Sequence, residues 1–459
     1  MKTLQPEIQI QDIRRDLAER VERALGRREG ILRVSVSVPE VDAFRWLSMQ
    51  PVGTRAVWSS RGTHRIVAMS GIADVYESGG RPDYDRLTRY INHHLGEADA
   101  GVRYYGGIRF DSARPVDPEW QAFGSLRFVL PRFELVVDDN GAELACNLVT
   151  HRDRARTAAI VREIGRLAWP RQTRSTELPH AVARHDQPAR AEWLKRVEES
   201  LAAIADLEIQ KVVLARRSTF EFDAPVRPID LIARLYAEAP NRFHYLVEAE
   251  DGSAFLGATP ERLVRREESF VFTEAVAGTR PAVEDEADDA ELLAALMASD
   301  KEQREHLCVR WAIEEILRPF CEDLAVDAHA SEMRLSRGRH LVSRFNGVLG
   351  EGVETWQLVR HLHPTPAVGG YPAPAAMRVI RRMETFDRGW YAGPIGWVGA
   401  DEAEFAVALR CALVNRNRMH IYSGAGIVEG SVPQEEWDEI EHKIVDFAGV
   451  LGLGGVQSE

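Results

Sequence analysis

Cysteine is scarce in this sequence of 459 residues, and the few cysteines stand far apart. Cys146, Cys308, Cys321 and Cys411 form no paired-ligand motif, and the 14 histidines include no HExxH arrangement. Isolated cysteines are typical of intracellular chains whose thiols are reduced and mostly buried. The pattern therefore argues against a zinc site and against covalently attached haem.

Long apolar runs are also missing, and none approaches the length that spans a bilayer. The first residues, MKTLQPEIQIQDIRRDLAER, alternate polar and apolar side chains and contain no signal-peptide core. Hydrophobic residues make up 45% and charged residues 28%, the balance of an ordinary soluble globular protein. We expect no membrane segment and a cytoplasmic protein.

Positive charge is in deficit, with 58 Lys and Arg against 71 Asp and Glu and a formal net charge of −13. Such a chain repels phosphate backbones, which argues against a nucleic-acid partner. An anionic substrate would need a local patch of positive charge or a bound cation.

The order of expected elements indicates an α+β fold. Segments such as Ile31–Val38 and Ser125–Glu134 alternate like half-exposed strands, and the chain closes with an expected helix from Gln434 to Leu451. Strands and helices do not alternate strictly, which favours antiparallel sheets over a doubly wound parallel sheet. A polar stretch around Pro179 predicts a linker over 166–188, between an N-terminal portion (1–165) and a second portion (189–459).

Two short acidic motifs, Glu302-Gln-Arg-Glu305 and Glu436-Trp-Asp-Glu439, are the most informative feature. Each places two carboxylates on one face of a helix, about one turn apart. A single ExxE is usually charge on a solvated helix, but two such faces brought together would surround a hard cation such as Mg²⁺. The pair predicts a magnesium site if the chain folds the two motifs together.

Two segments between and beside these motifs have the composition of ordered loops. Residues 362–372 (LHPTPAVGGYP) are too rich in proline and glycine for a regular element, and such a loop often lines a pocket. The segment 422–427 (YSGAGI) follows an expected strand and could bring backbone N–H groups against an anion, although a tight turn explains it equally well. It is not a dinucleotide fingerprint.

One lysine and one glutamate stand where solvated charges are unusual. Lys211 begins an apolar strand (KVVLA), and Glu261 follows the end of another in ATPER. A strand-edge lysine reaching water and a glutamate paired with Arg262 are the structural alternatives. The functional interpretation makes them a base and an acid on opposite sides of a pocket, which requires burial or neighbouring charges to adjust the pKa of each type of group.

Eight segments carry a resemblance to a known family. They occur in the order and spacing of the chorismate-utilising enzymes and cover about 190–450: Lys211–Arg217, Ala258–Leu263, Ala275–Pro281, Glu302–His306, His340–Ser343, His363–Pro372, Ala408–Ala412 and Ser423–Lys443. The family includes isochorismate, salicylate, anthranilate and aminodeoxychorismate synthases. The resemblance implies large antiparallel sheets in a layered core covered by helices, in which the two portions can form one interwoven fold.

At three positions the residue of this sequence resembles that of the isochorismate branch of the family. Lys211 stands where isochorismate and salicylate synthases carry a lysine that activates water and amine-using branches have glutamine. Ala277 replaces the nucleophilic lysine of aminodeoxychorismate synthases, and Ala367 stands where salicylate and anthranilate synthases tend to have threonine. The resemblance thus implies isomerisation of chorismate to isochorismate.

The roles of the charged residues follow from this resemblance. Lys211 would take a proton from a water that attacks the ring, and Glu261 would protonate the departing hydroxyl. Mg²⁺ would be held by Glu305 and Glu439, with Glu302 and Glu436 acting through waters.

The resemblance also implies a set of substrate contacts. The enolpyruvyl carboxylate would be gripped by Tyr391, Arg410, the backbone around Gly424, and Lys443. Gly278 and Thr279 would contact the ring, Ala367 would shape the pocket, and His340 would steady the leaving hydroxyl. A buried aromatic and a turn threonine remain alternative readings of Tyr391 and Thr279.

Short motifs in the first 165 residues, among them RAVWS, YGGIRF and FVLPR, resemble the menaquinone-pathway type more than the siderophore-pathway type. We expect a monomer or homodimer without an amidotransferase partner. Three alternatives stay open: a salicylate synthase that also eliminates pyruvate, an anthranilate synthase subunit, and a binding protein that has lost the chemistry.

Overall fold

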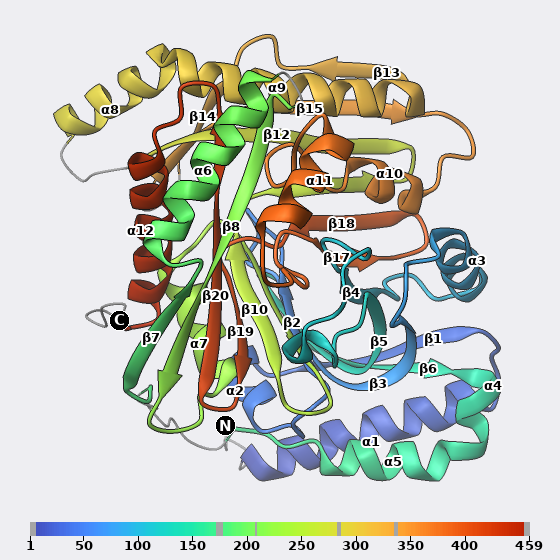
Figure 1. Ribbon diagram of the computed structural model, residues 1–459. Helices are drawn as coiled ribbons and strands as arrows, with labels where there is room; N and C mark the ends of the chain where they lie inside the picture. Colours follow the sequence, from blue (N-terminus) through green and yellow to red (C-terminus); the bar gives the residue numbers. More distant parts are fainter. Residues whose placement is uncertain (1–5, 171–177, 207–208, 282–285, 335–337, 454–459) are drawn as a thin grey trace.

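The computed structural model describes residues 6–170, 178–206, 209–281, 286–334 and 338–453 (Figure 1). Its strands are β1 Ile31–Val38, β2 Arg55–Ser59, β3 Ile66–Ser78, β4 Tyr104–Ile108, β5 Leu126–Asp138, β6 Gly141–Val149, β7 Ala181–Gln187, β8 Lys211–Phe222, β9 Phe243–Glu248, β10 Ala254–Thr259, β11 Arg262–Glu267, β12 Phe270–Pro281, β13 Cys321–Val326, β14 Ser331–Arg334, β15 Gly338–Leu349, β16 Gly370–Tyr371, β17 Pro394–Val398, β18 Glu402–Val407, β19 Cys411–Asn415 and β20 Arg418–Val428. The α-helices are α1 Pro6–Leu25, α2 Ala43–Ser48, α3 Tyr84–Leu95, α4 Thr150–Asp153, α5 Thr157–Arg166, α6 Arg190–Ala205, α7 Pro228–Glu238, α8 Glu286–Ala298, α9 Asp300–Leu317, α10 Thr355–Leu362, α11 Ala373–Met383 and α12 Pro433–Val450.

The strands form one continuous sheet in which every recorded pairing is antiparallel, such as β8 with β20 and β12 with β15. Buried and half-exposed side chains alternate in the second half of β8, whereas its first six residues are all buried. That first half is enclosed because helices cover one face of the strand and the rest of the sheet lies over its other face. The expected α+β fold with large antiparallel sheets is confirmed.

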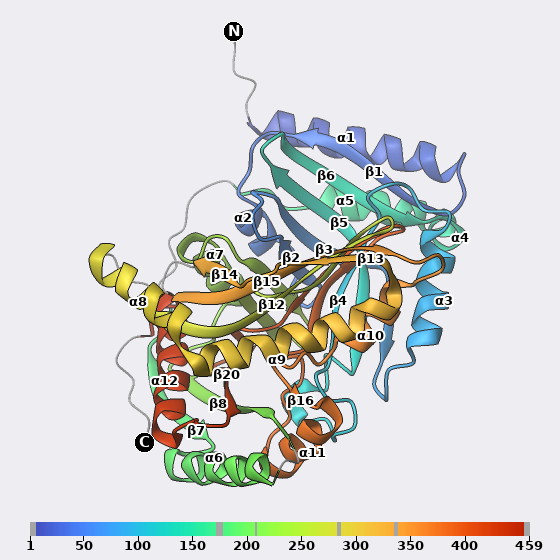
Figure 2. The same cartoon turned by 90° about the horizontal axis from the view of Figure 1, so that it is seen from above.

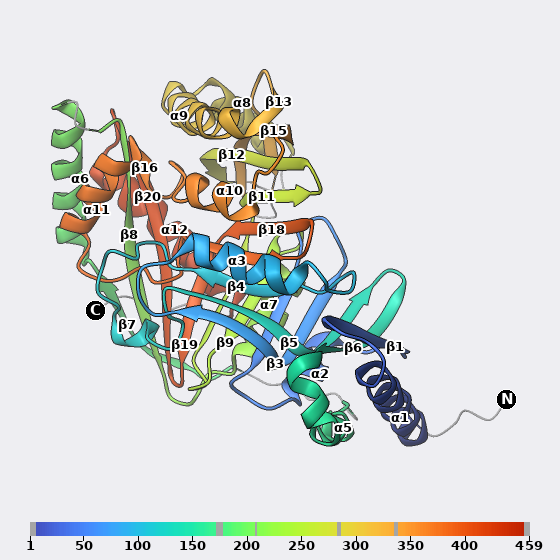
Figure 3. The same ribbon diagram turned by 90° about the vertical axis from the view of Figure 1, so that its right-hand side faces the viewer.

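The sheet divides at β5. One edge of β5 pairs with β3, and the other is shared by β4 and β6. From β3 a first wing runs through β2, β9, β10, β19 and β20 to β8. From β4 a second wing runs through β17, β18, β11 and β12 to β15. Figure 3 shows β8 and β20 at the left and β12 and β15 near the top centre.

Helices cover the outer parts of both wings. In the first wing α6, α11 and α12 contact β8 or β20, and in the second wing α9 packs on β12 and β15. At the far end α1 packs on β1, β6 and α5, as Figure 2 shows from above. The two acidic motifs therefore lie on helices of opposite wings, on α9 and α12.

Large aromatic rings join the segment between β4 and β5 to the first wing and to the loop before β17. Trp120 contacts Phe255 of β10 and Tyr422 of β20, and Phe255 also contacts Trp390. Gly389 leaves room for this cluster, because a Cβ at its φ of +56° would lie 2.0 Å from the Trp120 ring. The aromatic cluster fixes the loop that leads to Tyr391.

The expected linker over 166–188 is wrong in its second half. Residues Ala181–Gln187 form β7, which pairs with β8, and 171–177 lie outside the described residues. The segment is polar because β7 is an edge strand with only Arg184 fully buried. The division into two portions that can form one interwoven fold stays a prediction, and β2 pairs with β9 and β4 with β17 across them.

No helix in the described part of the chain is both long and apolar enough to cross a membrane.

Candidate active site

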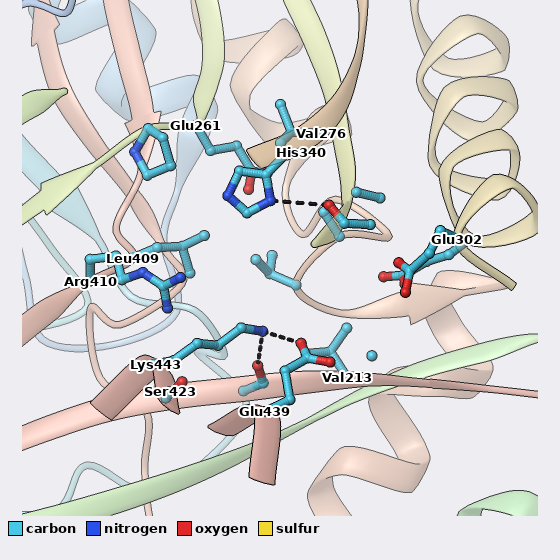
Figure 4. Close-up of a pocket in the computed structure, with 18 of the residues that line it drawn as sticks. Val213, Glu261, Val276, Glu302, His340, Leu409, Arg410, Ser423, Glu439 and Lys443 are labelled. Carbon is cyan, nitrogen blue, oxygen red and sulfur yellow. Dashed lines mark hydrogen bonds and ion pairs between the residues drawn. The ribbon is translucent and has the colours of Figure 1, made fainter. Parts of the chain in front are cut away.

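A pocket lies between the two wings and gathers most of the residues singled out from the sequence (Figure 4). Strands β8, β12, β15 and β20, helices α9 and α12, and the loops before β16 and β19 form its wall. The expected residues that line it are Glu261, Gly278, Glu302, Glu305, His340, Ala367, Tyr391, Arg410, Gly424, Glu439 and Lys443. Their individual roles stay predictions, which the geometry below makes specific.

Lys211 lies immediately behind this wall. Its side chain is fully buried at the start of β8, and its Nζ donates a hydrogen bond of 2.8 Å to Glu305 Oε1. Gly426 of the GAG segment makes room for the pair, because a Cβ there would lie 2.9 Å from Glu305 Oε1 and 3.4 Å from Lys211 Nζ. The alternative of a solvated strand-edge lysine is wrong, since the second wing covers the start of β8.

Glu261 is buried just after the end of β10, and the charge of Lys211 acts on its carboxyl group. Burial and the neighbouring Glu274 raise the pKa of Glu261 to about 8, although Lys211 and Thr365 act in the opposite sense. Glu274 itself accepts hydrogen bonds from Arg61 (2.7 Å) and from the backbone N–H of Arg262 (3.0 Å). Glu261 therefore holds a proton at neutral pH, as an acid catalyst must.

Three of the four motif carboxylates are paired with lysines in this structure. Besides the Lys211–Glu305 pair, Lys301 contacts Glu436 at 2.9 Å and Lys443 contacts Glu439. Burial and the nearby Glu439 raise the pKa of Glu436, whereas the pKa of Glu439 is lowered because Lys443 outweighs burial. Glu302 lines the pocket, and Glu436 lies behind it with a side chain only 1% exposed.

These carboxylates have the right chemistry for Mg²⁺ but are turned toward lysines. Among the described residues, no three acidic, histidine or cysteine side chains stand close enough to hold a metal ion in the present arrangement. Carboxylate oxygens are nevertheless the ligands that Mg²⁺ prefers. The Lys301 ammonium already lies among Glu436, Glu439 and Glu302, so the two helices do enclose a cation. The donor set therefore fits a hard cation that replaces the lysines.

Positive groups gather in one part of the pocket, beside Glu439. Lys443 Nζ donates to the carbonyl of Gly424 at 3.0 Å, and Arg410 is held beside it by a backbone with φ of +46°. Burial lowers the pKa of Arg410, although nearby acidic groups raise it in part. The Tyr391 hydroxyl approaches Gly424, where a Cβ would lie 2.9 Å away. This part of the pocket can bind a carboxylate.

His340 projects from β15 into the pocket as a neutral ring. Burial and nearby Arg410 lower the pKa of His340 to about 3, and its Nδ1 lies 3.1 Å from the carbonyl of Gly278. An Nδ1–H donor to that carbonyl leaves Nε2 as an acceptor for a hydroxyl. Gly278 has a φ of +76°, and a Cβ there would crowd Glu302. Thr279 pairs with His340 across β12 and β15, but its side chain lies outside the described part.

The sequence analysis missed the residues that hold the proline- and glycine-rich loop. Arg388 forms a buried ion pair with Glu384 and donates to the carbonyls of Val368 (2.9 Å) and Val213 (2.7 Å). It thereby ties the loop carrying Ala367 to β8. The composition of the loop indicated a pocket wall, but nothing in RRMETFDRGW distinguished Arg388 from the neighbouring surface arginines.

Comparisons with known proteins agree with this arrangement. The family model described as chorismate binding enzyme matches residues 17–452. Isochorismate synthase 2 of Arabidopsis thaliana is 32% identical over 92% of this chain and 81% of the relative. Isochorismate synthase MenF of Escherichia coli K12 is 31% identical over 92% of this chain and 94% of its own.

A solved structure of the menaquinone-specific isochorismate synthase MenF from E. coli superposes with a TM-score of 0.82 at 28% identity, covering 95% of this chain and 99% of that one. The resemblance to menaquinone-type isochorismate synthases is thus confirmed. With a family match over nearly the whole chain and these relatives, the chain belongs to the family of chorismate-binding enzymes.

Proposed function

We propose that this chain converts chorismate to isochorismate in the pocket between the wings. The observation that carries the proposal is a buried Glu261 with a pKa raised to about 8, close enough to the buried Lys211 for their charges to interact, in a pocket that Arg410 and Lys443 also line. Relatives that share most of the chain are named isochorismate synthases, which supports the same reaction.

The reaction exchanges one hydroxyl group for another. Lys211 takes a proton from a water whose oxygen bonds to the unsubstituted ring carbon next to the carboxyl-bearing carbon. The ring double bonds shift, the bond to the original hydroxyl breaks, and Glu261 gives that hydroxyl its proton as it leaves as water. One water enters and one leaves, so atoms and charge balance.

The remaining residues orient the substrate. Arg410 and Lys443, with the Tyr391 hydroxyl, bind the enolpyruvyl carboxylate, and His340 accepts from the hydroxyl that leaves. Gly278 and Ala367 leave space for the ring. Glu305 and Glu439 would hold Mg²⁺ directly, with Glu302 and Glu436 through waters. When bound, Mg²⁺ supplies positive charge for the ring carboxylate in a protein that is acidic overall.

Product analysis tests the proposal. We expect purified protein with chorismate and Mg²⁺ to yield isochorismate on chromatography, to stop when a chelator removes the metal, and to resume when Mg²⁺ is returned. A salicylate synthase would instead release pyruvate and fluorescent salicylate. Either of these products in place of isochorismate, or unchanged turnover with the chelator, would contradict the proposal.

The full-length likeness to a menaquinone-specific enzyme supports a role in quinone synthesis over siderophore synthesis. We therefore expect the gene to restore menaquinone in an E. coli strain that lacks isochorismate synthases. Restored siderophore production without menaquinone would point to the alternative pathway.

The raised pKa of Glu261 predicts a pH limit. Because the protonated carboxyl is the active form, kcat/KM should fall as pH rises through the pKa of about 8. The fall should be about tenfold for each further pH unit. A pH–rate profile measured at saturating Mg²⁺ checks this limit. A value of kcat/KM that stays level to about two pH units above the pKa of Glu261 would count against Glu261 as the acid.

A further inference from the structure

Lys301 is the lysine of the pocket that the proposed reaction does not use. It lies in the first turn of α9, directly before Glu302, and its Nζ donates to Glu436 Oε1 on α12 at 2.9 Å. The Lys301 side chain is 27% exposed and lines the pocket, whereas its partner is almost fully buried. The contact joins the helices that carry the two acidic motifs.

The ammonium of Lys301 lies close to carboxylates of both motifs. It donates to Glu436 at 2.9 Å, Glu302 is the next residue on α9, and Glu439 lies about one turn from Glu436 on α12. These three are among the four residues that would hold Mg²⁺ under the proposed function. The same oxygens cannot face both an ammonium and a dication without a large repulsion between the two cations.

We infer that Lys301 is an internal counter-ion that occupies the cation position between α9 and α12 in the metal-free enzyme and is displaced when Mg²⁺ binds. This inference rests on the proposed function, because it takes the same carboxylates as metal ligands. Without any cation, Glu436 would be buried beside Glu439 with no compensating charge, which is strongly unfavourable. Lys301 therefore keeps the empty site assembled and lowers its affinity for the metal.

Removal of the ammonium is expected to tighten metal binding. In Lys301→Met, Mn²⁺ should bind about tenfold more tightly than in the native protein, because the metal no longer competes with a tethered cation. The measurement is loss of the free Mn²⁺ electron paramagnetic resonance signal during titration without chorismate, with Mg²⁺ as competitor. Equal or weaker binding in Lys301→Met would overturn the inference.

Two further variants separate charge from packing. Lys301→Arg keeps a positive group and should bind Mn²⁺ no more tightly than the native protein. Lys195→Met is the matched control, since Lys195 is exposed on α6 and pairs with Glu199 of the same helix at 3.7 Å. It should leave both metal affinity and isochorismate formation unchanged, and tighter binding in this control would contradict a site-specific effect.

A measurement on the native protein covers the case in which Lys301→Met does not fold. Acetylation of lysines, followed by mass spectrometry, should modify Lys301 several-fold faster with Mg²⁺ than without it, while Lys195 stays unchanged. Equal Lys301 labelling in the two conditions would overturn the inference. Native protein that makes isochorismate but fails these tests would refute the role of Lys301 alone, whereas absent turnover would refute the proposed function.

Discussion

Replacement of Lys211 by methionine is expected to lower kcat by about 10³-fold, because the amine assigned to take the proton from water is removed. Methionine keeps the length and apolar stem that fill the start of β8. Chorismate binding should remain measurable, since Arg410 and Lys443 still line the pocket. Single-turnover kinetics and a chorismate titration measure the two quantities separately.

The control for this variant is again Lys195→Met, which removes an exposed lysine of α6. A thermal melt of Lys211→Met is needed as well, because Glu305 loses its 2.8 Å partner. Full turnover in a folded Lys211→Met protein would remove the assignment of Lys211 as the base.

Replacement of Glu261 by glutamine is expected to lower kcat by about 10²–10³-fold, because an amide has the shape of the carboxylic acid but cannot give its proton to the leaving hydroxyl. Since the native acid has a pKa of about 8, the variant should also lose the fall in activity above that pH. A pH–rate profile of the residual activity reads out both effects.

Glu250→Gln serves as the matched control for Glu261→Gln. Its side chain is 75% exposed just after β9, and its carboxylate lies 3.7 Å from Arg127, so kcat should be unchanged. If Glu261→Gln kept native kcat, or kept the same alkaline fall, another group would have to be the acid.

The sequence predicted the site well where short motifs determine it. Lys211, Glu261 and the two ExxE motifs are recognisable because each lies in a local pattern, and a helical spacing of three places Glu302 beside Glu305. That the two motifs meet depends on the wings: α9 packs on β12 and α12 on β20, and this pairing is not encoded in either motif alone.

The ion pair between α9 and α12 could not be predicted in the same way. Lys301 is an ordinary helix lysine in the sequence, and only tertiary packing shows that it faces Glu436. The Lys443–Glu439 pair, in contrast, has the i,i+4 spacing of a helical ion pair. Segment 181–187 was read as a linker because its side chains are polar, whereas its backbone pairs with β8. The alternation of apolar and polar residues identifies edge strands poorly, since few of their side chains are buried.

The central claim is that Lys211 directs a water onto the ring while Glu261 expels the original hydroxyl. Running the reaction in ¹⁸O-labelled water tests this claim directly, with mass spectrometry of the isochorismate formed early in the reaction. The account predicts that each product molecule carries one ¹⁸O, located at the newly hydroxylated carbon. Unlabelled isochorismate would mean that the hydroxyl migrates within the substrate, and this would contradict the assigned roles of both residues.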